Sequence, residues 1–176
     1  MSAPGFRIRV AGDEPRLAGA LAQVLLDCVE GGASVSFMWP LPLHKALGFW
    51  VSVLGSAQRG ERIVLLAEDS ASGDVVGTVQ VVFAAPDNQP HRADVAKMMV
   101  HRRARRRGLG AALLGAAEAA ARAAGRTLLV LDTVSGGDAE RLYTRLGWQR
   151  LGIIPGYALW PRGGLCDTTY FYKTLV

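Results

Sequence analysis

The sequence predicts a single α/β domain, residues 1–176, with a mixed, mostly antiparallel sheet of seven strands and about four helices. First, half of the 176 residues are hydrophobic, which fills one sizeable core but would leave two separate cores marginal. Second, strand-like and helix-like patterns follow one another in the order strand, two helices, three strands, helix, strand, helix, two strands. Third, an alanine-rich helix separates two of these strands, and a right-handed crossover makes such strands parallel.

The first half of the chain contributes a strand, two helices and a hairpin. Alternating apolar residues predict the strand, and apolar residues three and four positions apart predict the helices. Two β-branched runs on either side of the turn-forming segment 69–74 predict the hairpin. These elements are a strand at Phe6, Ile8 and Val10, helices from Leu17 to Gly31-Gly32 and from Leu43 to Gln58, and strands at Arg62–Glu68 and Val75–Ala84.

The second half contributes four strands and two helices, and a glycine should end each helix. Simple alternation along the first of these strands places Asp94, Ala96, Met98 and Val100 on one face and Val95, Lys97 and Met99 on the other. The elements are strands at Arg92–Val100, Thr127–Leu131 (bounded by Asp132), Trp148–Tyr157 and Thr168–Leu175, and helices at Leu109–Ala124 and Ala139–Leu146.

Composition argues against several classes of protein. No apolar run reaches the roughly 18 to 20 residues needed to span a bilayer, and no charged-then-apolar segment opens the chain. The two cysteines, Cys28 and Cys166, are too few for a disulfide framework or a four-ligand zinc site. We therefore expect a cytoplasmic protein with no membrane partner. Without histidine, cysteine and carboxylate residues at ligand spacing, we expect no catalytic metal.

The net charge of +5 is concentrated in one basic segment. Arg102, Arg103, Arg105, Arg106 and Arg107 lie within six positions. Such a run fits a solvated surface, a nucleic-acid patch or a site that meets phosphate. Neither interleaved aromatic residues nor a recognition helix accompanies the run, so we expect no nucleic-acid partner.

The residues that follow the arginines favour a phosphate site. Gly108 and Gly110 lie between a strand and a helix, and glycine lets the backbone approach an anion closely. Backbone N–H groups and the helix dipole would face the phosphate, and the flanking arginines could add charge-assisted hydrogen bonds. The alternative is a tight turn used only for packing. Neither the Walker pattern nor Gly-x-Gly-x-x-Gly after the first strand is present, which argues against a P-loop and a dinucleotide fold.

This segment resembles the GNAT superfamily of acetyltransferases. Residues 105–110 match its Arg/Gln-x-x-Gly-x-Gly/Ala signature, and Val100 precedes them by the usual five positions. Residues 139–148 are similar to its helix that ends in Tyr-x-x-x-Gly-aromatic. Residues 30–38 and 154–157 resemble, more narrowly, the tabtoxin resistance acetyltransferases of this superfamily. Gly136 departs from the pattern, because an asparagine often stands seven positions before the helix tyrosine.

The resemblance implies an acetyl-CoA-dependent N-acetyltransferase whose sheet splays at its central parallel pair. The pantetheine arm of acetyl-CoA would pair with the fourth strand, where a backbone N–H could stabilise the charge that develops on the thioester oxygen. The phosphates would lie on the glycine-bearing loop. The expected cofactor-binding residues are Met98, Met99, Val100, Arg105, Arg106, Arg107, Gly108, Leu109, Gly110 and Ala111.

Direct attack by a neutral amine in a ternary complex needs a base and an acid. Tyr143 matches the family tyrosine that protonates the departing thiolate; the alternative is a buried aromatic residue that only anchors its helix. Asp94 and Asp132 are the candidate bases, because each is expected where the two central strands diverge. Each could instead hold the substrate ammonium, or be a solvated aspartate at a strand end.

The acceptor is expected to be the primary amine of a small molecule that is amino-acid-like, an antibiotic or a toxin. The loop from residue 31 to 39 and the last hairpin should close the pocket, although their aromatic residues could also belong to the core. Alternatives are acetylation of a protein N-terminus or lysine and a noncatalytic acyl-CoA sensor, in a monomer or homodimer. The candidate substrate contacts are Ser34, Phe37, Trp39 and Tyr157.

Overall fold

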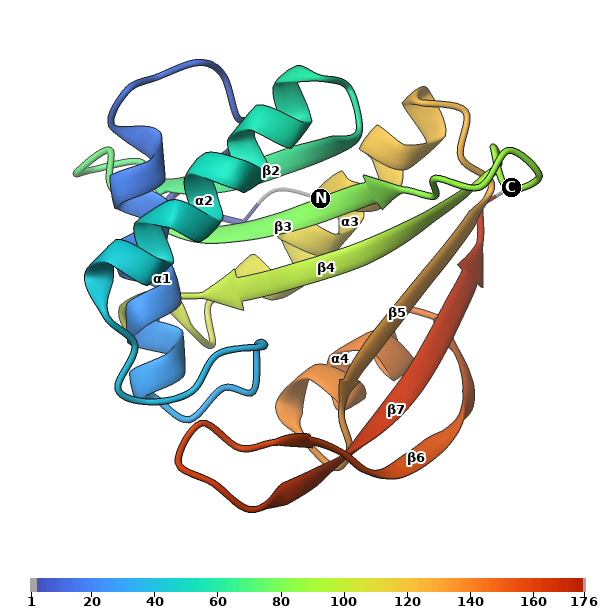
Figure 1. Cartoon of the computed structure of the whole chain (residues 1–176). Helices are drawn as coiled ribbons and strands as arrows, with labels where there is room; N and C mark the ends of the chain where they lie inside the picture. Colours follow the sequence, from blue (N-terminus) through green and yellow to red (C-terminus); the bar gives the residue numbers. More distant parts are fainter. Residues whose placement is uncertain (1–2, 176) are drawn as a thin grey trace.

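A computed structural model describes residues 3–175, which form seven strands, four α-helices and one 3-10 turn (Figure 1). The strand order is β1-β2-β3-β4-β5-β7-β6, and every neighbouring pair is antiparallel except β4 and β5. The predicted fold class is therefore confirmed. In chain order the elements are β1 (Phe6–Val10), α1 (Leu17–Glu30), α2 (Leu43–Gln58), β2 (Arg62–Asp69), β3 (Val75–Phe83), β4 (Arg92–Val100), η1 (Arg102–Ala104), α3 (Leu109–Ala123), β5 (Leu128–Val134), α4 (Asp138–Arg145), β6 (Gln149–Leu159) and β7 (Leu165–Thr174).

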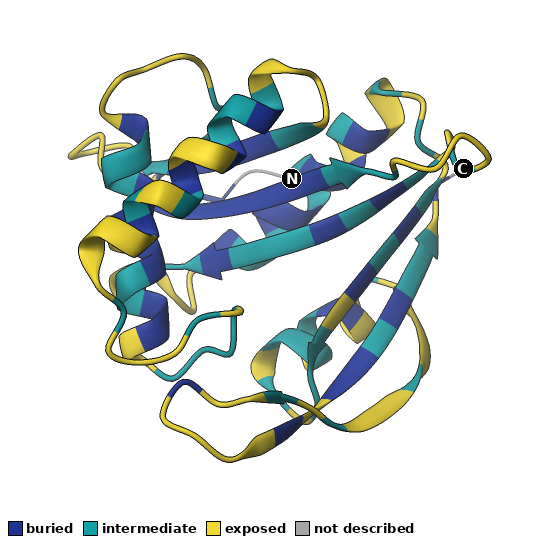
Figure 2. Ribbon diagram, viewed as in Figure 1, coloured by how far each residue is buried: buried dark blue, intermediate teal, exposed yellow. Residues whose placement is uncertain are grey.

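Two hydrophobic cores hold the helices on opposite faces of the sheet (Figures 1 and 2). Helices α1 and α2 pack on one face around the fully buried Leu25 and Trp50. Helix α3 packs on the other face, where its Leu113 lies in one cluster with Leu129 and Phe171. No helix within residues 3–175 is long and apolar enough to cross a membrane.

The parallel pairing of β4 and β5 is short. It covers three positions, from Arg92 opposite Leu128 to Asp94 opposite Val130. Beyond these positions β5 remains paired with β7, and β4 remains paired with β3, so the two central strands separate (Figure 1). The edge of β4 beyond Asp94 therefore borders an opening in the middle of the sheet.

A β-bulge interrupts β4 beside this opening. Ala96 lies opposite Gln80 and Met99 opposite Thr78, so one strand has two residues between these pairs where the other has one. Lys97, in the bulge, has a φ of 50°, in the left-handed region. Because of the extra residue, Met98 packs against the α3 side of the sheet and Met99 against the α1/α2 side. The faces predicted by simple alternation are thus wrong for the second half of this strand.

Strand β5 is longer than the sequence predicted. Asp132 was expected to bound it, but the strand continues to Val134 because residues 132–134 pair with residues 168–170 of β7. Asp132 therefore lies inside a strand, directly opposite Tyr170. The residues before and after Asp132 in the sequence are both paired with β7, and this fixes the backbone that carries its side chain.

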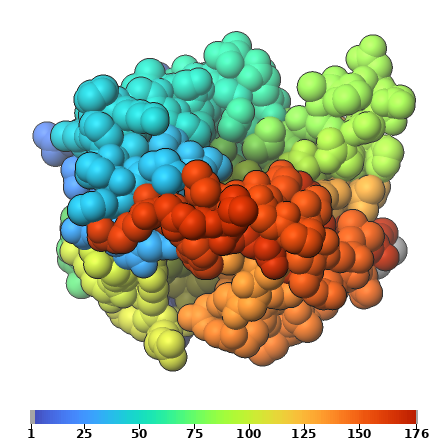
Figure 3. Space-filling model, turned by 60° about the horizontal axis from the view of Figure 1, so that its bottom comes forward, coloured from blue at the N-terminus to red at the C-terminus, as the bar shows by residue number. Residues whose placement is uncertain are grey.

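The loop between α1 and α2 is tied to the hairpin formed by β6 and β7. The backbone N–H of Trp39 donates to the carbonyl of Pro161 at 2.8 Å, and the hydroxyl of Ser34 donates to the carbonyl of Leu159 at 2.9 Å. Figure 3 shows the hairpin lying against this loop across the lower side of the molecule. The two segments that were expected to close the pocket thus contact one another.

A partly buried ion pair connects α3 to the C-terminal half of the sheet. The carboxylate of Glu118 accepts hydrogen bonds from Lys173 Nζ at 2.8 and 2.9 Å and from the Trp148 indole N–H at 3.0 Å. Lys173 also donates to the carbonyl of Leu146 at 2.8 Å. This cluster adds a connection between the two halves of the sheet, whose central strands β4 and β5 pair at only three positions.

We expect Glu118→Ala to lower the free energy of unfolding by about 3 kcal/mol, because it leaves the Lys173 ammonium without its carboxylate. Chemical denaturation followed by circular dichroism measures the loss. Glu30→Ala is the matched control, since Glu30 pairs with Arg102 on the surface and such pairs contribute little. Equal losses in the two variants would contradict the role given to Glu118.

Candidate active site

Around the gap left where β4 and β5 separate (Figure 1), which we call the cleft, four elements contribute polar side chains. Lys97 comes from β4, Asp132 from β5, Tyr143 from α4 and Tyr170 from β7. The charges of Lys97 and Asp132 act on one another, and the charge of Asp132 also reaches both tyrosines. We call these four residues, which are far apart in the sequence, the cleft cluster.

The segment 105–111 forms a backbone cradle at the open end of the cleft, after β4. Arg106 and Gly108 have left-handed φ values of 58° and 77°, which turn the chain sharply before α3. Gly108 is the N-cap of α3 and the helix has no side-chain cap, so its first N–H groups lack an acceptor within the helix. A Cβ on Gly108 would meet no protein atom within 4 Å. Free donors that face open space suit an anion.

Most arginines of the basic segment are bound to protein groups. The exception is Arg106, whose side chain is 91% exposed and approaches Asp138 only to 4.0 Å. Of the three arginines expected to contact phosphate, Arg106 is therefore the one whose side chain is free to do so. Of the others, Arg102 pairs with Asp27 and Glu30, Arg103 pairs with Asp74, Arg105 donates to the carbonyl of Val100, and Arg107 stacks on the ring of Phe6.

Gly110 differs from Gly108 in what surrounds it. A Cβ on Gly110 would lie 3.2 Å from Cδ2 of Leu142 and 3.9 Å from the sulfur of Met98. Its lack of a side chain therefore lets α3 approach α4 and the bulged part of β4. The sequence suggested one purpose for both glycines, and the structure gives packing as the purpose of the second.

Tyr143, on α4, belongs to the hydrophobic core on the α3 side of the sheet. Its side chain is buried, and its ring packs against Trp148 and Phe171 with ring centroids 5.9 Å away in each case. Burial, reinforced by the negative charge of Asp132, raises the pKa of its phenol above the usual range. The group is therefore a firmly protonated phenol beside a carboxylate, and its ring also has the anchoring contacts of a core residue.

The two candidate bases have different surroundings. Asp132 is exposed to the cleft, yet the protein that flanks it is enough for desolvation to raise the pKa of its carboxyl, with the positive charge of Lys97 opposing the rise. Asp94 stands at the last paired position of β4 and β5 and forms an ion pair with Arg92 at 2.7 Å. Both aspartates thus lie at the divergence, as expected, but one of them already has a cationic partner.

Comparison with known proteins identifies the family. The sequence profile described as an acetyltransferase (GNAT) domain matches residues 59–150. An N-acetyltransferase from Staphylococcus aureus Mu50 has a similar structure, with a TM-score of 0.80 and 17% identity over 97% of this chain and 99% of that one. A protein from Salmonella typhimurium solved with its cofactor acetyl-CoA has a TM-score of 0.76 and 21% identity, over 98% and 95% of the two chains. A ribosomal-protein-alanine N-acetyltransferase from Brucella melitensis has a TM-score of 0.78 and 23% identity, over 96% and 99%.

The chain belongs to the GNAT family of acetyltransferases. It is therefore an acetyl-CoA-dependent N-acetyltransferase, as the sequence predicted. The matched segment runs through β4, the cradle and α4, and so contains the open edge, the uncapped helix and Tyr143. The solved neighbours share the fold over nearly the whole chain, including the loop and the hairpin that lie outside this segment.

Sequence reasoning missed two members of the cleft cluster in this acetyltransferase. Lys97 was placed on a strand face and given no role, although one charged residue within an otherwise apolar stretch was a usable signal. Tyr170 was not considered, and it donates from its hydroxyl to that of Tyr157 at 2.8 Å. This hydrogen bond, together with burial and the charge of Asp132, raises the pKa of Tyr170 to about 12. Its part in the cleft depends on strand pairing, which no local pattern shows.

The four expected substrate contacts divide into two groups. Ser34 and Trp39 hold the α1–α2 loop to the hairpin, and the guanidinium of Arg162 stacks on the Trp39 ring at 3.8 Å. Phe37 packs edge-on against Phe49 with ring centroids 5.2 Å apart, and Tyr157 packs against Tyr170. Only the second group contacts residues on the wall of the cleft.

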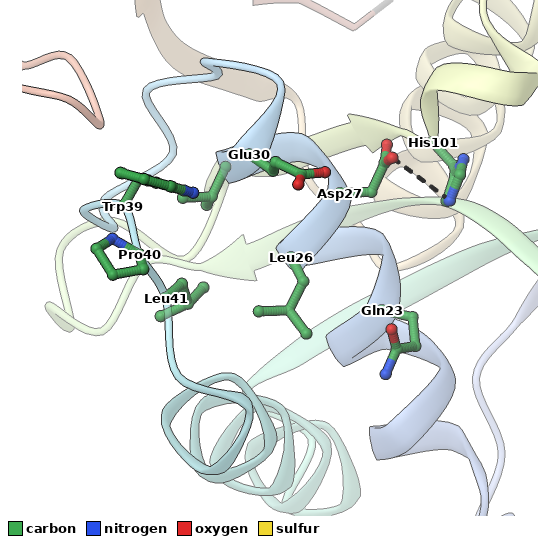
Figure 4. A pocket seen from close by; sticks show the side chains of 9 residues that line it. Gln23, Leu26, Asp27, Glu30, Trp39, Pro40, Leu41 and His101 are labelled. Atoms are coloured by element: carbon green, nitrogen blue, oxygen red, sulfur yellow. Dashed lines mark ion pairs between the residues drawn. The ribbon is translucent and has the colours of Figure 1, made fainter.

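A separate hollow of about 370 Å³ lies on the outer side of α1 (Figure 4). Its two carboxylates, Asp27 and Glu30, are both bound by Arg102, and His101 lies 3.6 Å from Asp27. None of its lining residues belongs to the cleft cluster. The lining residues are Gln23, Leu26, Asp27, Val29, Glu30, Trp39, Pro40, Leu41 and His101.

The two cysteines are buried free thiols. Burial raises the pKa of the Cys28 thiol, which makes it a poor nucleophile at neutral pH. Cys166 lies 3.8 Å from the hydroxyl of Ser34, at the contact between loop and hairpin. Within residues 3–175, no group of three or more histidine, cysteine or carboxylate side chains is arranged to hold a metal ion.

Proposed function

We propose that this acetyltransferase transfers the acetyl group of acetyl-CoA directly to the primary amine of a small molecule bound beside it. The observation that supports the proposal is that Asp132, beyond the last paired position of β4 and β5, is near enough for its charge to act on Tyr143. The contact between the α1–α2 loop and the β6–β7 hairpin supports a small acceptor, because it joins the two segments expected to close the pocket. The resemblance of residues 30–38 and 154–157 to tabtoxin resistance acetyltransferases supports an amino-acid-like molecule, an antibiotic or a toxin. The two free cysteines fit a reducing compartment such as the cytoplasm.

The cradle fits the phosphates of acetyl-CoA on three observations: open space at Gly108, an uncapped helix N-terminus and the exposed Arg106. Backbone N–H groups of the cradle, residues 105–111, would hold the phosphates. The edge of β4 at residues 98–100 would hold the pantetheine arm by backbone pairing, as an added strand does. When bound, acetyl-CoA supplies the thioester carbon that the amine attacks.

Asp132 is proposed as the base. Its carboxylate would take the proton that the attacking amine loses as the new C–N bond forms. The raised pKa of Asp132 makes it a better proton acceptor than an ordinary aspartate. None of the ion pairs within residues 3–175 includes Asp132, whereas Arg92 pairs with Asp94. Asp94 would then hold Arg92 and add negative charge to the wall that receives an ammonium group.

Tyr143 is proposed as the acid. Its phenol keeps its proton at neutral pH, and it would give that proton to the thiolate as the C–S bond breaks. The rings of Trp148 and Phe171 fix its direction. Thus one carboxylate receives a proton and one phenol supplies a proton within the same cleft.

We expect Gly108→Ala to weaken CoA binding about tenfold or more, because its Cβ enters the open space of the cradle and displaces phosphate from backbone donors. Isothermal titration calorimetry with CoA measures the change. Gly125→Ala is the matched control: Gly125 follows the other end of α3 with a φ of 74° and equally open space, so the backbone strain is the same. Retained CoA affinity in Gly108→Ala would show that the phosphates bind elsewhere.

We expect the wild-type protein, with acetyl-CoA and a panel of small primary amines, to release free CoA, and Tyr143→Phe to lower kcat about 10²-fold. Thiol release is followed by absorbance, and CoA binding by calorimetry. Binding should be unchanged in the variant, because the phenol acts only on the departing thiolate. A panel with no turnover, when cell-extract proteins gain acetyl groups by intact mass, would instead assign a protein substrate. Unchanged kcat in Tyr143→Phe would show that Tyr143 only anchors its helix.

The rate should rise with pH as the Asp132 carboxyl loses its proton, and because its pKa is raised, the rise should lie above the usual aspartate range. A profile of kcat/KM against pH measures this limb. Asp132→Asn should lower kcat/KM about 10²-fold and abolish the limb. Asp94→Asn is the discriminating variant, since it should keep the limb. If Asp94→Asn removes it instead, the two aspartates exchange roles.

A further inference from the structure

The acceptor side of the cleft contains one cation whose purpose acetyl transfer alone does not explain. Lys97 sits in the bulge of β4 with its left-handed φ of 50°. Its ammonium donates to the hydroxyl of Ser36 at 3.0 Å and lies 6.0 Å from the ring centre of Phe49. These contacts place the ammonium beneath the α1–α2 loop, on the α1/α2 side of the sheet.

This ammonium is half-buried but has no close carboxylate. None of the ion pairs within residues 3–175 includes Lys97. Asp132 acts on it only from a longer range, and the positive charge of Arg62 opposes the ammonium from the other side. A cation removed from water without a partner is unfavourable, so such a group points to a ligand that completes it.

The hydrogen-bonding capacity of Lys97 supports the same conclusion. An ammonium has three N–H donors, and Ser36 accepts one of them. Ser36 itself has a left-handed φ of 76°, an unfavourable backbone conformation for a residue other than glycine. Unfavourable backbone at both ends of one hydrogen bond is typical of a site whose geometry is kept for binding.

The cleft has carboxylates at one place and an ammonium at another, so its charges are complementary to those of a zwitterion that carries an ammonium and a carboxylate. Asp132 and Asp94 lie at the point where the strands diverge, and Lys97 lies farther along β4. We propose that Lys97 binds a carboxylate of the acceptor while its amine lies against Asp132, so that the acceptor is an amine that carries an anionic group. This inference rests on the proposed function, because it places the acceptor in the same cleft. Lys97 is then the residue that selects between charged and neutral amines.

The test compares matched acceptors. The α-amino acids, their carboxamides and the corresponding alkylamines are each offered with acetyl-CoA, and CoA release gives kcat and KM. For any amine accepted, we expect the carboxylate form to be preferred in kcat/KM by about 10- to 100-fold, as for a hydrogen bond between charged groups. Lys97→Met should reduce this preference by about the same factor, through a higher KM for the carboxylate form.

Three controls separate selection from structure. Lys97→Arg should keep the preference for the carboxylate form, because it keeps the charge. Lys45→Met, on the exposed side of α2 one turn before Phe49, should change nothing. In Lys97→Met, the carboxamide and the alkylamine should keep their KM. A purely structural lysine would instead affect all three acceptors equally.

The possible failures are distinguishable. If amines are acetylated without preference for the carboxylate form, or if Lys97→Met changes all acceptors by one factor, the inference about Lys97 is overturned and the proposed function stands. If no small amine is acetylated by any variant while CoA still binds, the proposed function fails first. Acceptance of neutral amines alone would also overturn the assignment of Lys97.

Discussion

The site depends on a sheet whose central strands come apart after three paired residues. Backbone N–H and C=O groups in a protein interior need partners. The edge of β4 beyond Asp94 therefore needs a partner that can form backbone-like hydrogen bonds, and the amides of a pantetheine arm have that chemistry. The separation is tolerated because each strand is paired on its other side, β4 with β3 and β5 with β7 over seven positions. The hydrogen bond from Lys173 to Glu118 also connects α3 to β7. The pairing of β4 with β3 and of β5 with β7 therefore allows β4 and β5 to separate.

The bulge in β4 gives this opening two different walls. One extra residue reverses the faces of the strand, so Met98 turns toward Gly110 and α3 while Lys97 turns toward Ser36 and the α1–α2 loop. The sides proposed for the cofactor and for the acceptor are therefore set by adjacent residues. A regular strand would have placed Lys97 on the α3 side, where the core is apolar.

Local patterns predicted the elements well, since helical spacing and glycine stops are read within a few residues. Helices α1 and α2 begin and end where expected, Tyr143 lies on the predicted helix, and Asp94 lies at the last paired position before the central strands separate. The errors come from partners that no local pattern shows. The extension of β5 depends on β7, and the partner of Arg105 is a backbone carbonyl set by the turn of the loop. The role of Lys97 depends on a loop some sixty residues earlier in the chain.

The electrostatics of the cleft follow from the partial burial of its groups rather than from the net charge of the chain. Arg102 and Arg103 pair with carboxylates, and Arg105 and Arg107 are held by a carbonyl and an aromatic ring, which leaves Arg106 and the backbone donors for the proposed contact with phosphate. In the cleft, burial raises the pKa of Asp132 and of Tyr143 and lowers the pKa of Lys97, so it moves all three groups toward their neutral forms. A neutral carboxyl and a neutral amine would be poor partners for a charged acceptor. An acceptor that carries both an ammonium and a carboxylate restores each charge by supplying its opposite, and binding would then prepare Asp132, as a carboxylate, for proton transfer.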